Sequence, residues 1–194
     1  MRAAAWPAAL MAILVSARVT PDSRPGQDQV GCSNPVLSGD ELYVRSLSSL
    51  AGGGYLSIDQ DRVVAADELG HPGVRARFRL ETDMLSGPVH TGHTVFLRSA
   101  HSGFHIDVRS AQESAARARW RDHGQFQSLM LFKDQRHDDT TLAVCYGDTI
   151  YLRAHTRAFL DVEGDLVRAR WGNRGDYQRF VLEHAHEHLQ RDSL

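Results

Sequence analysis

The 194-residue chain has few of the groups that mark metal-rich, disulfide-rich or membrane-spanning proteins. Its only cysteines are Cys32 and Cys145, and no cysteine–histidine cluster has zinc-site spacing. Lysine occurs once, at Lys133, so arginine supplies almost all the positive charge. No Asn-x-Ser/Thr sequence occurs, so we expect no N-linked glycan. Beyond the N-terminal segment, no apolar run reaches the roughly 20 residues of a membrane span.

Motifs of common catalytic sites are also missing. The sequence contains no Gly-x-Ser-x-Gly, no His-Glu-x-x-His and no glycine-rich phosphate loop. The formal net charge of −2 gives no general attraction to nucleic acids or anionic membranes. We therefore expect no catalytic residues, no cofactor, no metal site and no nucleic-acid partner.

The N-terminal segment has the pattern of a secretory signal peptide. Arg2 precedes an apolar run from Ala3 to Val15, which only Pro7 interrupts, and Ala17 offers a small residue for cleavage. This pattern predicts a signal peptide over residues 1–17 and a secreted or extracellular protein. The alternative is an apolar N-terminal helix or a signal anchor.

The two cysteines lie far apart in the sequence. In an oxidising compartment the simplest prediction is one disulfide between Cys32 and Cys145, with Cα atoms within about 7 Å. It would tie the N-terminal lead-in to the segment that enters the third repeat. The alternative is two unpaired thiols.

An internal repeat is the strongest signal in the sequence. A six-residue pattern of alternating polar and apolar residues, with an arginine in fifth place, occurs three times, at 41–46, 94–99 and 149–154. Each copy precedes three more short segments with strand character. These segments are 55–59, 63–66 and 78–80 in the first unit, 104–108, 116–120 and 129–132 in the second, and 159–162, 167–171 and 180–182 in the third.

Four strands in each of three units specify a twelve-stranded, all-β protein with the β-trefoil fold. We expect a lead-in over residues 18–38, the β-trefoil domain over 39–185 and a C-terminal tail over 186–194. Alternation along the strands predicts a shared core. The residues expected in this core are Leu42, Val44, Leu56, Ile58, Phe78, Leu80, Val95, Leu97, Ile106, Leu131, Ile150, Leu152, Leu160, Phe180 and Leu182.

The opposite face of each first strand carries an aromatic residue and an arginine. These pairs are Tyr43 with Arg45, Phe96 with Arg98 and Tyr151 with Arg153. The face either packs against the adjoining hairpin, with the arginines paired locally, or forms a repeated ligand surface.

The repeat resembles that of the fascin-type and hisactophilin-type β-trefoil family. The first unit carries the motif as Tyr55-Leu56-Ser57 and, further along, Phe78-Arg79-Leu80-Glu81. The third unit carries it from Tyr151-Leu152-Arg153-Ala154-His155 to Phe180-Val181-Leu182-Glu183. The resemblance covers roughly residues 41–184 and implies a β-trefoil that binds or bundles actin, a partner that requires a cytosolic protein. The Gln-x-Trp motif of ricin-type lectins is absent.

A twice-repeated Arg-Ala-Arg-Trp segment is the most distinctive candidate for a ligand site. Guanidinium groups bind sulfate or carboxylate bidentately, and tryptophan stacks on sugar rings or arginine planes. The first unit has no such segment. The alternative is a solvated strand whose tryptophan covers the barrel end. The predicted ligand-binding residues are Arg117, Arg119, Trp120, Arg168, Arg170 and Trp171.

Histidines gather near the C-terminus, at His184, His186 and His188. In an extended tail they would share one side and could bind zinc or copper adventitiously, or else they belong to a solvated tail. With no catalytic motif, the sequence favours a secreted, non-enzymatic binding module that recognises a glycan or a protein. The alternative function is fascin-like actin binding.

Overall fold

The chain divides into two units, Met1–Gly31 and Cys32–Leu194. A computed structural model describes residues 32–48, 54–66, 72–84, 86–135 and 142–185. The predicted signal peptide and the C-terminal tail over 186–194 lie outside the described residues. Within those residues, no helix has the length and apolar character needed to cross a membrane.

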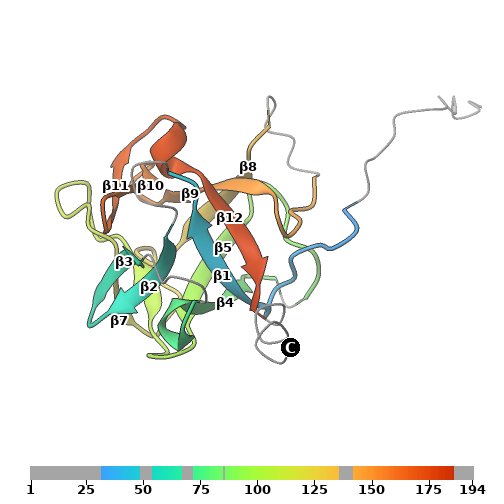
Figure 1. Ribbon diagram of the computed structural model, residues 1–194, viewed down its shortest axis with the longest axis horizontal. Helices are drawn as coiled ribbons and strands as arrows, with labels where there is room; N and C mark the ends of the chain where they lie inside the picture. Colours follow the sequence, from blue (N-terminus) through green and yellow to red (C-terminus); the bar gives the residue numbers. More distant parts are fainter. Residues whose placement is uncertain (1–31, 49–53, 67–71, 85, 136–141, 186–194) are drawn as a thin grey trace, which may run out of the picture. The chain divides into compact units, whose positions relative to one another are not determined.

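The described residues form an all-β structure with twelve strands (Figure 1). The first lobe contains β1 (Glu41–Ser46), β2 (Tyr55–Asp59), β3 (Arg62–Ala66) and β4 (Arg77–Thr82). The second contains β5 (Thr94–Ser99), β6 (His105–Asp107), β7 (Arg117–Trp120) and β8 (Leu129–Lys133). The third contains β9 (Thr149–Ala154), β10 (Phe159–Glu163), β11 (Leu166–Trp171) and β12 (Phe180–His184). Short 3-10 helices, η2 (Val74–Ala76) and η3 (Asp176–Gln178), precede β4 and β12.

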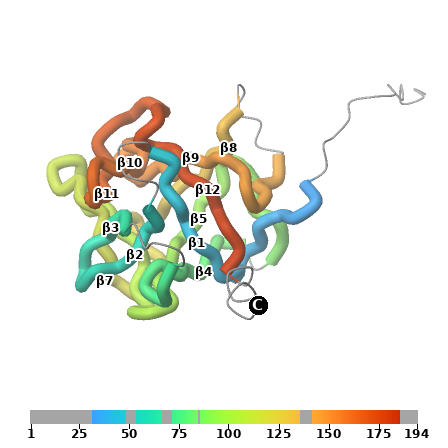
Figure 2. The backbone as a smooth tube through the Cα atoms, viewed as in Figure 1, coloured from blue at the N-terminus to red at the C-terminus, as the bar shows by residue number. Residues whose placement is uncertain are grey.

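The first and fourth strands of each lobe close a six-stranded antiparallel barrel. Its strands pair in the order β1, β4, β5, β8, β9 and β12, and β12 returns to β1. The second and third strands of each lobe form hairpins, which meet through the pairs Val64–Leu166, Arg62–Arg117 and Ala115–Arg168. In Figure 2, β3, β7 and β11 gather on the left of the view. A barrel capped by three hairpins is the β-trefoil that the repeat predicts.

The barrel interior contains the predicted core. All fifteen residues expected there are buried and belong to one hydrophobic cluster. Fully burying a side chain of this size contributes about 1.5–3 kcal/mol relative to exposure, so a shared core stabilises lobes that have too few apolar residues to fold alone. The prediction of core positions is confirmed.

The opposite face of the first strands packs between neighbouring elements. Tyr43, Phe96 and Tyr151 are all at least nine-tenths buried. In the first lobe, Arg45 Nε lies 2.5 Å from a Glu183 carboxylate oxygen. The second- and third-lobe arginines likewise contact Glu81 and the Phe132 ring. These contacts favour local packing over a repeated ligand surface.

Cys32 and Cys145 form a disulfide, with their Cα atoms 5.8 Å apart, as the sequence predicts. Backbone pairing supports the same junction: Pro35 bridges to Cys145, and the Val36 N–H donates to the Val144 carbonyl at 2.9 Å. The N-terminal lead-in is therefore joined to the segment that precedes β9.

Candidate functional site

Each Arg-Ala-Arg-Trp segment contains a β-bulge. In the second lobe, His105 pairs with Trp120 while Ile106 pairs with Ala118, so Arg119 is an extra residue. In the third lobe Arg170 is extra in the same way, between Ala169 and Trp171. The structure thus departs from the regular strand expected, in which Arg117 and Arg119 share one face. A bulge re-aims the side chains around it, which here sets the direction of each arginine and tryptophan.

The bulged arginines bind buried aspartates. Arg119 contacts both carboxylate oxygens of Asp107, with Nε at 3.3 Å from one of them. Arg170 contacts Asp161, with Nε at 3.1 Å. Both aspartate side chains are fully buried. Hydrogen bonding to the aspartate raises the pKa of each arginine above its ordinary value, so both arginines remain charged.

The other predicted site residues differ in what they can offer a ligand. Arg117 forms an ion pair with Asp61 at 2.7 Å, and Arg168 is partly exposed. Trp120 and Trp171 are 50% and 52% exposed. Of the six residues, the two tryptophans therefore present the most free surface, while three of the arginines have carboxylate partners.

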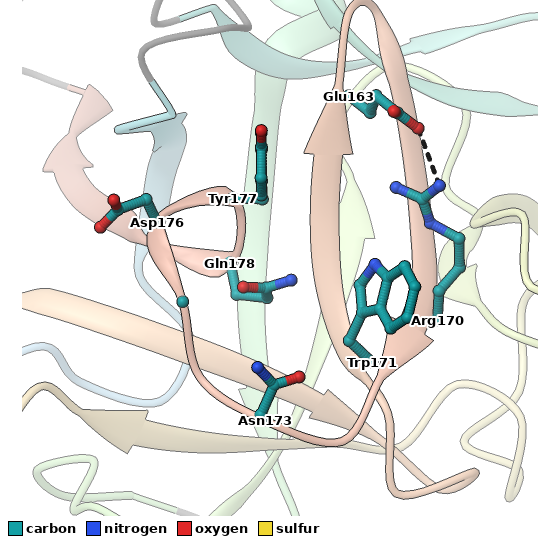
Figure 3. Close-up of a pocket in the computed structure, with 8 residues that line it drawn as sticks. Glu163, Arg170, Trp171, Asn173, Asp176, Tyr177 and Gln178 are labelled. Carbon is teal, nitrogen blue, oxygen red and sulfur yellow. Dashed lines mark hydrogen bonds and ion pairs between the residues drawn. The ribbon is translucent and has the colours of Figure 1, made fainter.

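A cavity of about 390 Å³ lies beside Trp171 (Figure 3). It belongs wholly to the third lobe, from the end of β10 to η3. In Figure 3 the Trp171 and Tyr177 rings stand on either side of the space, and the Asn173 side chain lies on the loop that joins their segments. The residues that line it are Glu163, Arg170, Trp171, Asn173, Gly175, Asp176, Tyr177 and Gln178.

The loop that carries Tyr177 is fixed by its own hydrogen bonds. The Gln178 N–H donates to the Gly175 carbonyl at 3.2 Å, and the Gln178 side chain is buried. A Cβ atom on Gly175 would lie only 2.9 Å from Gln178 Oε1, so glycine makes room for this close approach. Gly124 and Gln127 repeat the arrangement in the second lobe, which shows that the turn is part of the repeat.

The cavity combines aromatic surface with polar groups but carries little free positive charge. Tyr177 is 40% exposed and adds a second ring beside Trp171. Arg170 is neutralised by Asp161 and by Glu163, whose carboxylate lies 2.7 Å from Arg170 Nη1. This composition suits a neutral ligand with an apolar face and several hydroxyl groups, because amide and carboxylate oxygens accept hydrogen bonds from hydroxyls.

The second lobe contains counterparts of some of the aromatic and polar residues that line the third-lobe cavity. Trp120 and Phe126 are 50% and 40% exposed at the positions of Trp171 and Tyr177. Phe126 has no hydroxyl group, and Arg109 occupies the position of Glu163 in the repeat. The first lobe has no bulge, since Tyr55 and Leu56 pair in register with Ala66 and Ala65. The full aromatic and polar set is therefore found in the third lobe.

Trp171 and Arg170 are the two cavity residues that the repeated Arg-Ala-Arg-Trp segment predicts, and the other lining residues are not predicted by it. A signal for the missed residues does exist: the loop after each tryptophan repeats an aromatic-Gln pair, Phe126-Gln127 and Tyr177-Gln178, two residues after a glycine. Asn173 and Asp176 lie in that loop and have no strand pattern to mark them.

A second hollow of about 250 Å³ is more basic. It is lined by Arg77, Arg79 and Arg98 together with Glu41. Arg77 pairs with Glu41 at 3.5 Å, and Arg79 donates to the Gly39 carbonyl at 3.1 Å. This hollow is the better match for an anionic group, although its arginines already have partners.

The fold is similar to that of several solved structures. A protein O-mannosyltransferase complex of S. cerevisiae bound to the sugar donor aligns with 81% of this chain at 14% identity and a TM-score of 0.62. This chain covers 26% of that chain. An SDF2-like protein from Arabidopsis thaliana gives a TM-score of 0.62 at 7% identity, over 76% of this chain and 94% of its own.

A designed threefold-symmetric protein, ThreeFoil, aligns with 74% of this chain, and 97% of its own, at 20% identity and a TM-score of 0.52. No family model and no curated protein matches the sequence. At these identities the structural matches confirm the β-trefoil fold and leave the fascin-type family a prediction.

Proposed function

We propose that this protein is a secreted, non-enzymatic glycan-binding module whose site is the third-lobe cavity. The observation that carries the proposal is the half-exposed Trp171 ring beside Tyr177, Asn173 and Asp176 in one cavity. A pocket with an apolar wall and a few convergent polar groups is typical of small-ligand sites. A sugar ring offers a matching apolar face and a rim of hydroxyl groups.

The charge of the cavity favours a neutral glycan over the sulfated or acidic one that the arginines of the sequence indicate. Arg170 contacts two carboxylates, so a ligand anion would compete with Asp161 and Glu163 for the same guanidinium. Asp176 is highly exposed and adds further negative charge. Neutral hydroxyl groups meet no such competition.

Two observations support export and a carbohydrate context. The Cys32–Cys145 disulfide is typical of oxidising compartments, in agreement with the predicted signal peptide. One structural neighbour is a protein O-mannosyltransferase complex bound to the sugar donor, so a similar fold occurs within a protein that binds a sugar compound. The rest of that protein has no counterpart in this chain, so its activity is not part of the proposal.

A glycan array tests the proposal directly. The mature chain should bind one or a few neutral glycans, and Trp171→Ala should weaken that binding by about tenfold or more, as for a central aromatic contact. Val74→Ala is the matched control, because Val74 is an exposed apolar residue in the corresponding loop of the first lobe. Binding restricted to sulfated glycans and unaffected by Trp171→Ala would contradict the proposal and would favour the basic hollow lined by Arg77, Arg79 and Arg98 as the site.

Actin binding is the alternative, favoured by the fascin-type motifs of the repeat. It requires that the N-terminal segment is not an export signal and that the protein stays in the cytosol. The mature N-terminal sequence separates the two functions: cleavage near residue 17 supports export, and an intact Met1 on cytosolic protein supports actin. Co-sedimentation with filamentous actin is the direct test of the alternative.

A further inference from the structure

Two histidines converge on one carboxylate oxygen in the second lobe. His105 Nε2 lies 3.0 Å from Glu81 Oε2, and His123 Nε2 lies 2.7 Å from the same oxygen. The candidate ligand atoms of these three residues all lie within 4.8 Å of one another. We name these residues the Glu81 cluster. It lies outside the Trp171 cavity and is independent of the proposed glycan function.

The barrel brings the cluster together from distant parts of the sequence. Glu81 on β4 pairs with Phe96 on β5, and Arg98 on β5 pairs with His105 on β6. His123 lies in the loop after β7, where its ring stacks on Phe96 with 4.2 Å between centroids and 4° between planes. These aromatic contacts bring both imidazole rings toward Glu81 before any ligand arrives, with the His105 ring buried and the His123 ring at the surface.

We propose that the Glu81 cluster binds a divalent transition metal ion, with Zn²⁺ as the best match. Two imidazole nitrogens and one carboxylate oxygen are a donor set that Zn²⁺ uses, with a fourth position left for water or a ligand group. Imidazole donors favour Zn²⁺, Cu²⁺ and Ni²⁺ over Mg²⁺ and Ca²⁺, which prefer oxygen. The metal would replace the protons that now link the histidines to Glu81.

The geometry requires only a small adjustment. Zn–N and Zn–O bonds of about 2.0–2.2 Å in a tetrahedral site place neighbouring ligand atoms about 3.3–3.5 Å apart. The present nitrogen–oxygen distances of 3.0 Å for His105 and 2.7 Å for His123 are shorter, so the larger movement is required of His123. His105 is 1% exposed and fixed, whereas the His123 side chain is 40% exposed. His123 can therefore move outward, and it also gives a metal ion access from solvent.

Neighbouring groups orient the ligands. Arg98 Nη1 lies 3.6 Å from Glu81 Oε1, the oxygen that does not face the histidines. Such a contact fixes the carboxylate and leaves Oε2 for the metal, although the positive charge of Arg98 opposes a cation. The Nδ1 atom of His105 is buried with no hydrogen-bond partner among the described residues. The ring nitrogen of His105 that is placed to coordinate a metal ion is therefore Nε2, which faces Glu81.

The corresponding positions in the other lobes carry different chemistry. In the first lobe, Glu183 accepts a hydrogen bond from the Tyr55 hydroxyl at 2.7 Å and contacts Arg45. In the third lobe, Phe132 occupies the position of Glu81 and packs against Phe159. Within the part of the chain that the structure describes, neither position forms a group like the Glu81 cluster, so Glu183 provides a matched carboxylate for comparison.

Isothermal titration of the EDTA-stripped, mature chain with ZnCl₂ tests the site. We expect one zinc ion per chain, with an affinity that falls more than about tenfold in His123→Ala and in Glu81→Gln, since loss of even an outer-shell partner costs 10–100-fold. The control Glu183→Gln should bind as wild type does. A second control, His186→Ala with His188→Ala, removes histidines of the C-terminal tail and should also leave the affinity unchanged.

Thermal unfolding with and without zinc guards against misfolded variants. Zinc at about 100 times its Kd should raise the Tm of the wild type by roughly 5–10 °C and that of His123→Ala much less. His123→Ala should still unfold cooperatively without metal, because His123 is exposed. The proposal is wrong if the wild type binds no zinc, if His123→Ala binds it equally well, or if only the tail variant loses binding.

Discussion

Arg170 extends its guanidinium over the carboxylate of Asp161, a side chain with no exposed surface. Arg119 and Asp107 repeat this pair in the second lobe. Each arginine occupies the extra position of a β-bulge. The tryptophan that follows it in the sequence points outward and is about half exposed. The pair therefore links a buried charge in the hairpin to the exposed ring of the candidate site.

Replacing Arg170 with alanine should destabilise the protein. The change leaves Asp161 buried without its partner, which typically costs 3–5 kcal/mol, and we expect about 3 because the Arg170 side chain is 24% exposed. Urea unfolding measures the difference. Arg168→Ala, two residues earlier on β11, is the control and should change stability by about 0.5 kcal/mol or less. Equal stability of Arg170→Ala and wild type would contradict a structural role for the pair.

The Tyr55 hydroxyl should lose its proton at a higher pH than an ordinary tyrosine does. Burial and then the hydrogen bond to Glu183 raise the pKa of Tyr55 from 10.0 to about 12. The folded state thus holds this proton more tightly than the unfolded state does, so its contribution to stability is complete below pH 10 and is lost as pH rises through 12. In a spectrophotometric titration, the number of tyrosine hydroxyl groups that ionise at unusually high pH should be one lower in Tyr55→Phe than in the wild type.

Tyr151 gives the internal control for that titration. Its pKa is also raised, first by burial and then by the negative charge of Asp134, and it should titrate late in both proteins. A titration curve that Tyr55→Phe leaves unchanged would show that the hydroxyl is not held by Glu183.

Loss of the disulfide should lower stability by about 2–4 kcal/mol. Cys32 and Cys145 close a loop that spans 113 positions, and long loops gain most from a cross-link in the chain-entropy model. The variant with both cysteines changed to serine should unfold at lower urea concentration, with the same fold by circular dichroism. Two free thiols in non-reducing mass spectrometry of secreted protein would refute the pairing.

The fold could be predicted from the sequence because the strand pattern repeats. The first strands at Glu41–Ser46, Thr94–Ser99 and Thr149–Ala154 have the bounds that the sequence predicts. Core positions follow from alternation, as Leu42 and Val44 illustrate, since period-two burial depends only on local backbone geometry.

The sites could be predicted only in part, for two physical reasons. A bulge changes the register without any marker in the sequence, so the contact of Arg170 with Asp161 follows only from the pairing of β10 with β11. The Glu81 cluster joins residues from three separate elements, and their contact depends on how the barrel closes. Spacing along the chain contains neither kind of information.

The position of the bound glycan tests the central claim most directly. Of the three tryptophans, Trp6 lies in the predicted signal peptide, so the mature chain should give two indole N–H signals, from Trp120 and Trp171. In a two-dimensional ¹H–¹⁵N NMR titration with the strongest array ligand, the Trp171 signal should shift at the lowest concentrations, and Trp120 should shift later or not at all. Saturable binding that leaves the Trp171 signal unmoved would contradict a third-lobe glycan site.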